Sequence, residues 1–155
     1  MSAYKAPLNE FIFLLKHLVN YDAHAELPGY EGVGMEMVEA ILPEAAKFFE
    51  NIIAPTNLET DQQGTRLNDG EVQIAPVIKG LGAQMSQAGW TGLGGSKDYD
   101  GSGFPGVVDL AVQEMLQSAN MSLSLLPLLT KGVIHALSLY GTDLQKQLFL
   151  SLIHI

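Results

Sequence analysis

Apolar residues recur at three- and four-residue intervals along most of this chain, which is the period of an α-helix rather than the alternation of a strand. The clearest segment is 35–53, whose apolar face comprises Val38, Ile41, Leu42, Ala45, Phe49, Ile52 and Ile53. Because a helix must bury such a stripe against another element, repeated stripes favour packing of helix on helix. We therefore expect an all-α, bundle-like domain of about six helices.

The expected helix boundaries depend on proline, glycine and capping residues. Asn9 is the expected N-cap of a first helix over 10–19, and Pro43 predicts a kink or two abutting helices within 35–53, because proline has no backbone N–H. The remaining helical segments are 76–89, 105–119, 123–139 and 143–150, the last capped by Thr142.

Two segments lack the helical period. We expect a loop over 20–34 and a polar stretch over 54–75. Within the second, Asp69-Gly70 favours the positive backbone angles of a two-residue turn, so we expect a minor hairpin there.

Composition excludes several classes of function. With 155 residues, the chain has the length of one domain, and its net charge of −9 disfavours nucleic acids and anionic membrane surfaces as partners. Cysteine is absent from the sequence, which excludes disulfides, thiolate nucleophiles and cysteine metal sites. No uninterrupted apolar run reaches the roughly 18–20 residues of a membrane span. With no secretory signal evident at the N-terminus, we expect a cytoplasmic protein.

The glycine-rich segment 89–106 contains a match to the dinucleotide-binding pattern G-x-G-x-x-G, at 101–106. In a true site, a buried strand delivers this loop to a helix N-terminus, but the preceding residues 96–100 do not form a strand pattern. We therefore favour a structural turn. The phosphate-binding P-loop is excluded, because Lys97 lacks the required neighbours.

The remaining polar residues indicate no active site of their own. The histidines are too far apart for a zinc pair at i, i+4, and His135 lies in an apolar helix, where a structural role is favoured. The clustered glutamates are expected on solvated helix faces. From the residues alone, we assign no catalytic residue and no metal ligand.

Several segments resemble the N-terminal helical domain of flavin-dependent acyl-CoA dehydrogenases. In that family a helix ends at Gly-Trp, an irregular glycine loop follows and a long helix then begins, as at 89–103 here. The stretch 141–147, Gly-Thr-Asp-Leu-Gln-Lys-Gln, resembles the turn into the last helix of that domain. The stretch 54–57, Ala-Pro-Thr-Asn, resembles the end of its second helix.

Other stretches are similar to the branch that contains 3-methylmercaptopropionyl-CoA dehydrogenases. They are 4–8 (Tyr-Lys-Ala-Pro-Leu), 27–30 (Leu-Pro-Gly-Tyr), 44–48 (Glu-Ala-Ala-Lys-Phe) and 119–122 (Ala-Asn-Met-Ser). The resemblance covers about residues 4–148.

The resemblance implies α,β-dehydrogenation of an acyl-CoA thioester with FAD as the hydride acceptor. In the family, the flavin lies between a middle β-domain and a C-terminal helical domain, which usually supplies the glutamate base. These domains are the implied partners, in a homo-oligomeric full-length protein. We therefore expect this chain to be inactive alone, to bind FAD weakly at most, and to contain no catalytic residue.

The resemblance also implies that this domain walls the acyl pocket. The expected substrate-lining residues are Ser124, Pro127, Leu128 and Gly132, although core packing explains them equally well. For Gly132 there is a physical argument too, because the absent side chain permits close approach.

We expect residues 1–150 to form the acyl-CoA dehydrogenase N-terminal-like domain and 151–155 to be an apolar tail foreign to the family pattern. This departure after Gln147 suggests a truncated chain. The alternative is a non-catalytic helical interaction module that reuses the fold.

Overall fold

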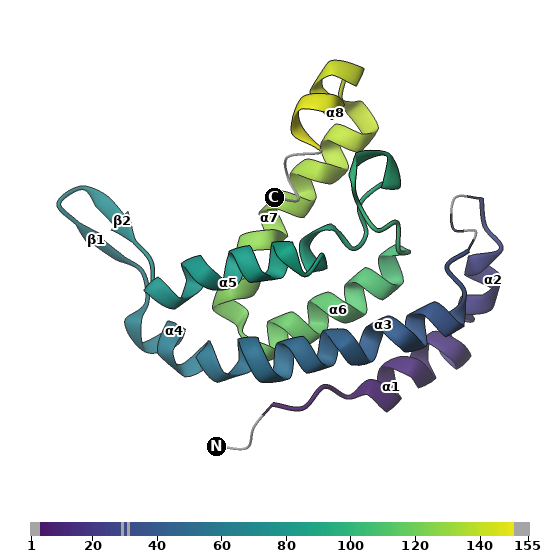
Figure 1. The fold of residues 1–155 in the computed structure, drawn as a ribbon, viewed down its shortest axis with the longest axis horizontal. Coiled ribbons are helices and arrows are strands. Elements are labelled where there is room, and N and C mark those ends of the chain that lie inside the picture. Colours follow the sequence, from purple (N-terminus) through teal and green to yellow (C-terminus); the bar gives the residue numbers. More distant parts are fainter. Residues whose placement is uncertain (1–3, 29, 31, 151–155) are drawn as a thin grey trace.

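The computed structural model describes residues 4–28, 30 and 32–150, and its fold is mainly helical (Figure 1). In chain order the α-helices are α1 (Leu8–Phe13), α2 (Tyr21–Ala25), α3 (Met35–Phe48), α4 (Asn57–Gln63), α5 (Pro76–Gln87), α6 (Gly106–Ala119), α7 (Met121–Tyr140) and α8 (Asp143–Phe149). The strands within the described residues are β1 (Arg66–Asn68) and β2 (Glu71–Gln73). The predicted all-α class with a minor hairpin is confirmed. The predicted tail, 151–155, lies outside the described residues.

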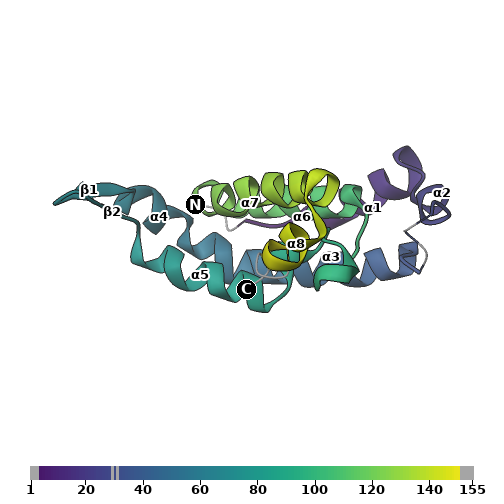
Figure 2. The ribbon, with the colours of Figure 1, turned by 90° about the horizontal axis from the view of Figure 1, so that it is seen from above.

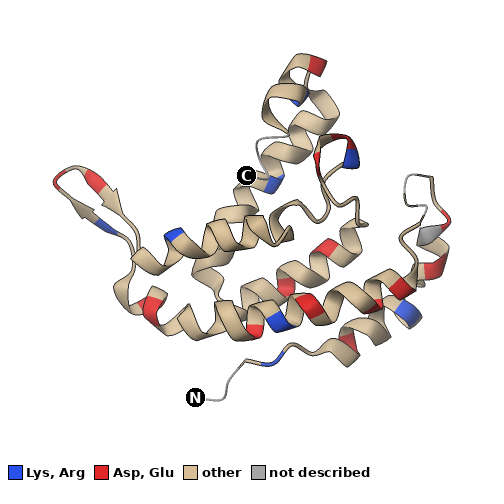
Figure 3. Cartoon of the chain, viewed as in Figure 1, with Lys and Arg blue, Asp and Glu red and all other residues tan. Residues whose placement is uncertain are grey.

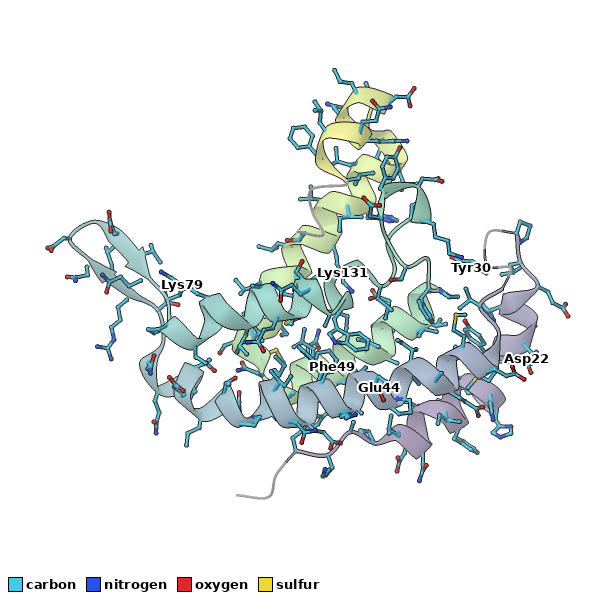
Figure 4. All side chains as sticks on the ribbon, in the orientation of Figure 1. Asp22, Tyr30, Glu44, Phe49, Lys79 and Lys131 are labelled. Carbon is cyan, nitrogen blue, oxygen red and sulfur yellow. The ribbon has the colours of Figure 1, made fainter. Side chains whose placement is uncertain are left out.

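The hydrophobic core lies where α3 and its π-helical continuation, Phe49–Ile53, pack against α6. Phe49 is fully buried, and its ring lies 5.9 Å from that of Trp90, which follows α5. Figure 4 shows Phe49 pointing into the interior of the domain. The tryptophan of the glycine-rich segment is therefore part of the core that joins α3 to that segment.

The N-terminal segment packs along α3. Helix α1 begins directly after Pro7, so the prediction of Asn9 as N-cap is wrong, and Asn9 lies inside the first turn. Lys16 forms an ion pair with Glu39 of α3. The expected loop over 20–34 contains α2, whose fully buried Tyr21 donates a hydrogen bond to the carbonyl of Val33 at 2.9 Å. A single buried side chain holds this short helix in place, and one apolar residue does not produce a recognisable helical period in the sequence.

Helix α3 continues through Pro43. Of the two predicted alternatives, a kink or two abutting helices, the division into two helices is therefore wrong, and the kink stays a prediction. A proline removes one backbone hydrogen bond from a helix. Its neighbours Leu42, Ala45 and Ala46 are buried in the core. Tertiary packing on both sides of the proline therefore offsets the local loss.

The stretch 54–75 contains both an unexpected helix, α4, and the expected hairpin. Asp69 and Gly70 have φ values of 49° and 82°, as a two-residue turn with two positive φ angles requires. The two strands pair antiparallel, with Leu67 opposite Val72, and both side chains are exposed. In both Figure 1 and Figure 2, the hairpin projects from the end of the molecule opposite α2.

A buried asparagine joins α6 to α7 and ties both to α4. The side-chain oxygen of Asn120 accepts a hydrogen bond from the backbone N–H of Leu123 at 3.0 Å, which caps α7. Its amide donates to the hydroxyls of Thr56 and Thr60, each at 3.1 Å. At the other end of α7, Gly141 is the C-cap. Thr142 caps α8, as expected.

The attachment of the N-terminal segment is expected to depend on pH through Glu50. Lys5 donates to Glu50 at 2.5 Å and the backbone N–H of Ala6 donates at 2.9 Å, and these hydrogen bonds hold the pKa of Glu50 below its usual value. Because the pKa of Glu50 is lower in the folded state, the ionised side chain stabilises the fold. This contribution is complete at pH values above the ordinary glutamate pKa of about 4.3, and it is lost as the pH falls through the folded-state pKa.

We therefore expect the difference in unfolding free energy between the wild type and Glu50→Gln to shrink as the pH is lowered. Urea unfolding at a series of pH values measures it, with Glu10→Gln, at an exposed glutamate of α1, as the control. A difference that stays constant across this range would contradict the assignment.

Candidate functional site

The four predicted lining residues all lie on α7, but they are not gathered around one cavity. Ser124 is 2% exposed, and its hydroxyl donates to the carbonyl of Met121 at 2.7 Å. Leu128 is 48% exposed, and a side chain at Gly132 would meet no atom within 4 Å among the described residues. Their spacing of four residues places Ser124, Leu128 and Gly132 on one face of the helix. Pro127 lies on a neighbouring face.

The outer surface of α7 and α8 is strongly apolar. Among Lys, Arg, Asp and Glu, α7 carries Lys131 alone (Figure 3). The exposed large apolar side chains on these two helices are Met121, Leu125, Leu126, Leu128, Leu129, Val133, Leu139, Tyr140, Leu144, Leu148 and Phe149. Many exposed large apolar side chains on two consecutive helices favour a site of interaction.

The length and composition of α7 would also allow it to cross a membrane. In this fold it packs against α4, α5 and α6. A helix with these neighbours is part of the domain, although most of its surface remains exposed.

A small, partly open pocket lies between α5 and α7, on the side that carries Pro127. Its volume is about 170 Å³, and it is lined by Gly82, Met85, Ser86, Thr91, Leu123, Leu126, Pro127, Thr130 and Lys131. Of the four predicted lining residues, Pro127 alone contributes to its wall. The pocket is mostly apolar.

An ion pair lies beside both this pocket and a larger groove, since Lys131 lines both of them. Lys131 of α7 donates to both carboxylate oxygens of Asp109 on α6, at 2.6 and 2.5 Å, and both side chains are mostly buried. Figure 4 shows the position of Lys131 on α7. The groove has a volume of about 910 Å³ and is lined by the glycine-rich segment, the start of α6 and the second half of α7, including His135. Within the described residues, no group of three His, Asp or Glu side chains is placed to hold a metal ion.

The glycine-rich segment is a tightly bonded turn. The backbone N–H groups of Gly101 and Gly103 donate to the carbonyls of Ser96 and Gly95, each at 2.9 Å. A Cβ on Gly101 would lie 2.2 Å from the carbonyl carbon of Gly95. The glycine at 101 therefore permits two backbone segments to touch, which agrees with the predicted structural turn.

Replacing Gly101 with alanine is expected to lower the free energy of unfolding by about 1–3 kcal/mol, because the added methyl group meets backbone that has to move. Thermal unfolding measures the effect. Gly106→Ala is the control, since a Cβ there meets nothing within 4 Å among the described residues. Equal stability of the two variants would contradict the close contact.

Comparison with known proteins identifies the family of this chain. Residues 35–153 match the sequence profile described as the acyl-CoA dehydrogenase, N-terminal domain. The chain is also 35% identical over 147 residues to the 3-methylmercaptopropionyl-CoA dehydrogenase of Ruegeria pomeroyi, an alignment that covers 95% of this chain and 25% of that protein.

This chain belongs to the acyl-CoA dehydrogenase N-terminal domain family. It spans about a quarter of the length of the relative it matches. The family profile begins with α3, yet only 5% of the chain falls outside the alignment with the relative. Most of the N-terminal segment that contains α1 and α2 is therefore shared with that relative.

In this acyl-CoA dehydrogenase N-terminal domain, sequence reasoning missed the pocket between α5 and α7. The available signal was Gly82, a glycine inside an otherwise apolar helical segment. Such a glycine lowers helix stability and usually has a packing or functional reason. No sequence feature indicates that Thr91 lines this pocket, because its position depends on the path of the turn that follows α5.

Proposed function

We propose that this chain supplies one wall of the acyl pocket in an FAD-dependent enzyme that dehydrogenates an acyl-CoA thioester between its α- and β-carbons. The observation that carries the proposal is the family membership of a domain whose longest helix exposes a nearly uncharged apolar face. On α7, Leu128 and Gly132 are exposed, whereas Ser124 is buried. An acyl chain requires such a surface, because burial of each methylene group contributes roughly 0.8 kcal/mol.

In this proposal the glycine-rich segment does not hold the flavin. The glycine pattern at 101–106 is the candidate for its phosphates, but the N–H groups of Gly101 and Gly103 already donate to backbone carbonyls. A diphosphate would need those donors free. The proposal therefore assigns FAD, and the glutamate base, to parts of the enzyme outside this chain.

We also propose that the rest of such an enzyme covers the exposed apolar side chains of α7 and α8. Three quarters of the length of the relative lie outside its match to this chain. A folded domain of that size can bury the exposed leucines of α7, which would otherwise favour association. By similarity to the relative, a short thioether acyl-CoA is the proposed substrate class.

The first test uses the 155-residue chain. After incubation with FAD and gel filtration, we expect a colourless protein that does not reduce an electron-acceptor dye in the presence of acyl-CoA. A protein that stays yellow and turns over acyl-CoA would contradict the proposed inactivity.

The second test uses the reading frame that encodes this chain in its genome. Translation into a β-rich segment and a helical domain, and acyl-CoA-dependent dye reduction by the purified product, are the expected results. A stop codon directly after Ile155 would instead favour the alternative, a non-catalytic helical interaction module.

A further inference from the structure

Helix α7 is anchored at its start and loosely packed beyond it. Its buried residues are Leu123 and Ser124, and no residue after Ser124 is buried in this helix, all of which the structure describes. The second half instead faces the rest of the domain across the pocket beside α5 and the groove beside the glycine-rich segment. Figure 1 shows this half of α7, with α8 at its end, projecting from the body that contains α3 and α6. A segment with few buried side chains can move at a low cost in free energy.

A proline lies at the point where this loose packing begins. Pro127 has no backbone N–H for the carbonyl of Leu123, and its ring crowds the preceding turn, so the helix bends more easily there. Pro43 in α3 has the same local defect, but buried residues lie on both sides of it. Packing therefore holds both parts of α3 in place, whereas the part of α7 after Pro127 contains no buried residue to do so.

An ion pair links the second half of α7 to α6. Lys131 lies about one helical turn after Pro127 and donates to both carboxylate oxygens of Asp109. The side chains are 23% and 17% exposed, so salt and water screen the pair less than they would at the surface. Asp109 belongs to the first turn of α6, a helix whose inner face is buried in the core. The pair therefore fastens a loosely packed segment to a firmly packed helix.

We propose that Pro127 is a hinge and that the Lys131–Asp109 ion pair is the latch that holds the second half of α7, with α8, against the domain. When one partner is removed, the other charge stays largely buried and unpaired, which is costly. A swing of the helix away from α6 returns that charge to water. The same swing widens both the pocket and the groove, because Lys131 lines both of them. This device is a property of the domain itself and does not depend on the proposed function.

The test measures a distance within the 155-residue chain. The sequence contains a single tryptophan, Trp90, and no cysteine, so Ala136→Cys provides one attachment site for a fluorescence acceptor. Trp90 lies in the core, and Ala136 is exposed on the second half of α7. Time-resolved energy transfer from Trp90 then gives the distribution of distances between the domain body and this half of the helix. With the ion pair intact, we expect one narrow distribution.

Breaking the latch is expected to add a second, longer distance. Lys131→Met removes the charge but keeps a long side chain, and Asp109→Asn should have the same effect. Lys131→Arg keeps the charge and is expected to retain the single distance. Combining Lys131→Met with Pro127→Ala supplies the missing N–H and a good helix former, so the longer distance should disappear. Pro43→Ala in the Lys131→Met background is the matched control and should leave the longer distance in place.

A second acceptor position on α3, Glu44→Cys, reports on the domain body, and its distance from Trp90 is expected to stay the same in every variant. An unchanged distribution at position 136 in Lys131→Met would overturn the latch. Equal broadening at both acceptor positions would overturn it too, because it would indicate a general loss of structure. A longer distance that persists after Pro127→Ala would overturn the hinge.

Discussion

Replacing Asn120 with alanine is expected to lower the free energy of unfolding by about 3 kcal/mol. The side chain is fully buried, caps α7 through Leu123 and donates to Thr56 and Thr60. Loss of an N-cap alone costs about 1 kcal/mol. The further loss arises because the buried N–H of Leu123 is left without an acceptor and cannot reach water.

Urea unfolding monitored by circular dichroism measures this effect. Thr142→Ala is the matched control, because Thr142 also caps a helix but is exposed to solvent. We expect it to cost about 1 kcal/mol. Equal losses in the two variants would show that burial of the Asn120 network adds nothing to capping.

The other large effect is expected for Phe49→Ala, which should lower the free energy of unfolding by about 3–5 kcal/mol. Phe49 is fully buried at the centre of the core and lies against Phe48 and Trp90, with ring centroids 5.7 and 5.9 Å away. Its truncation loses the burial of an aromatic ring and leaves a cavity that these large neighbours can fill only in part.

For a chain of this length, such a loss corresponds to a fall of roughly 6–20 °C in the melting temperature. Differential scanning calorimetry measures it. Phe13→Ala is the control, because Phe13 is 60% exposed and its removal is expected to change stability by no more than about 0.5 kcal/mol. A small effect at Phe49 would contradict its central position in the core.

Much of the fold could be predicted because its helix ends carry local signals. Pro76 begins α5, and Gly89, with φ of 81°, follows its end. Gly141 and Thr142 mark the boundary between α7 and α8. Each residue acts through its own backbone or through hydrogen bonds to near neighbours, so the sequence predicts these boundaries without knowledge of the tertiary structure.

The helices that were missed depend on contacts distant in sequence. Helix α2 is held by the burial of Tyr21, and α4 by Thr60, which meets Asn120 across 60 residues of chain. The two helices have five and seven residues, too few for a recognisable apolar period.

The candidate site likewise combines features that the sequence predicts with features that depend on tertiary packing. Composition alone indicates that α7 is apolar and nearly uncharged, and Leu128 and Gly132 are among its exposed residues. The pocket at Gly82 and Thr91 forms between elements, and which side of α7 faces α5 is a property of the packing. Whether Ser124, Pro127, Leu128 and Gly132 contact substrate stays a prediction.

The buried network at Asn120 also affects how α7 could meet a partner. It fixes the first turn of a long apolar helix to α4 and α6 through bonds wholly internal to this domain. The exposed leucines beyond that turn are therefore held in position before anything covers them. A surface that is already ordered loses little conformational entropy on docking, so more of the energy of burial remains available as affinity.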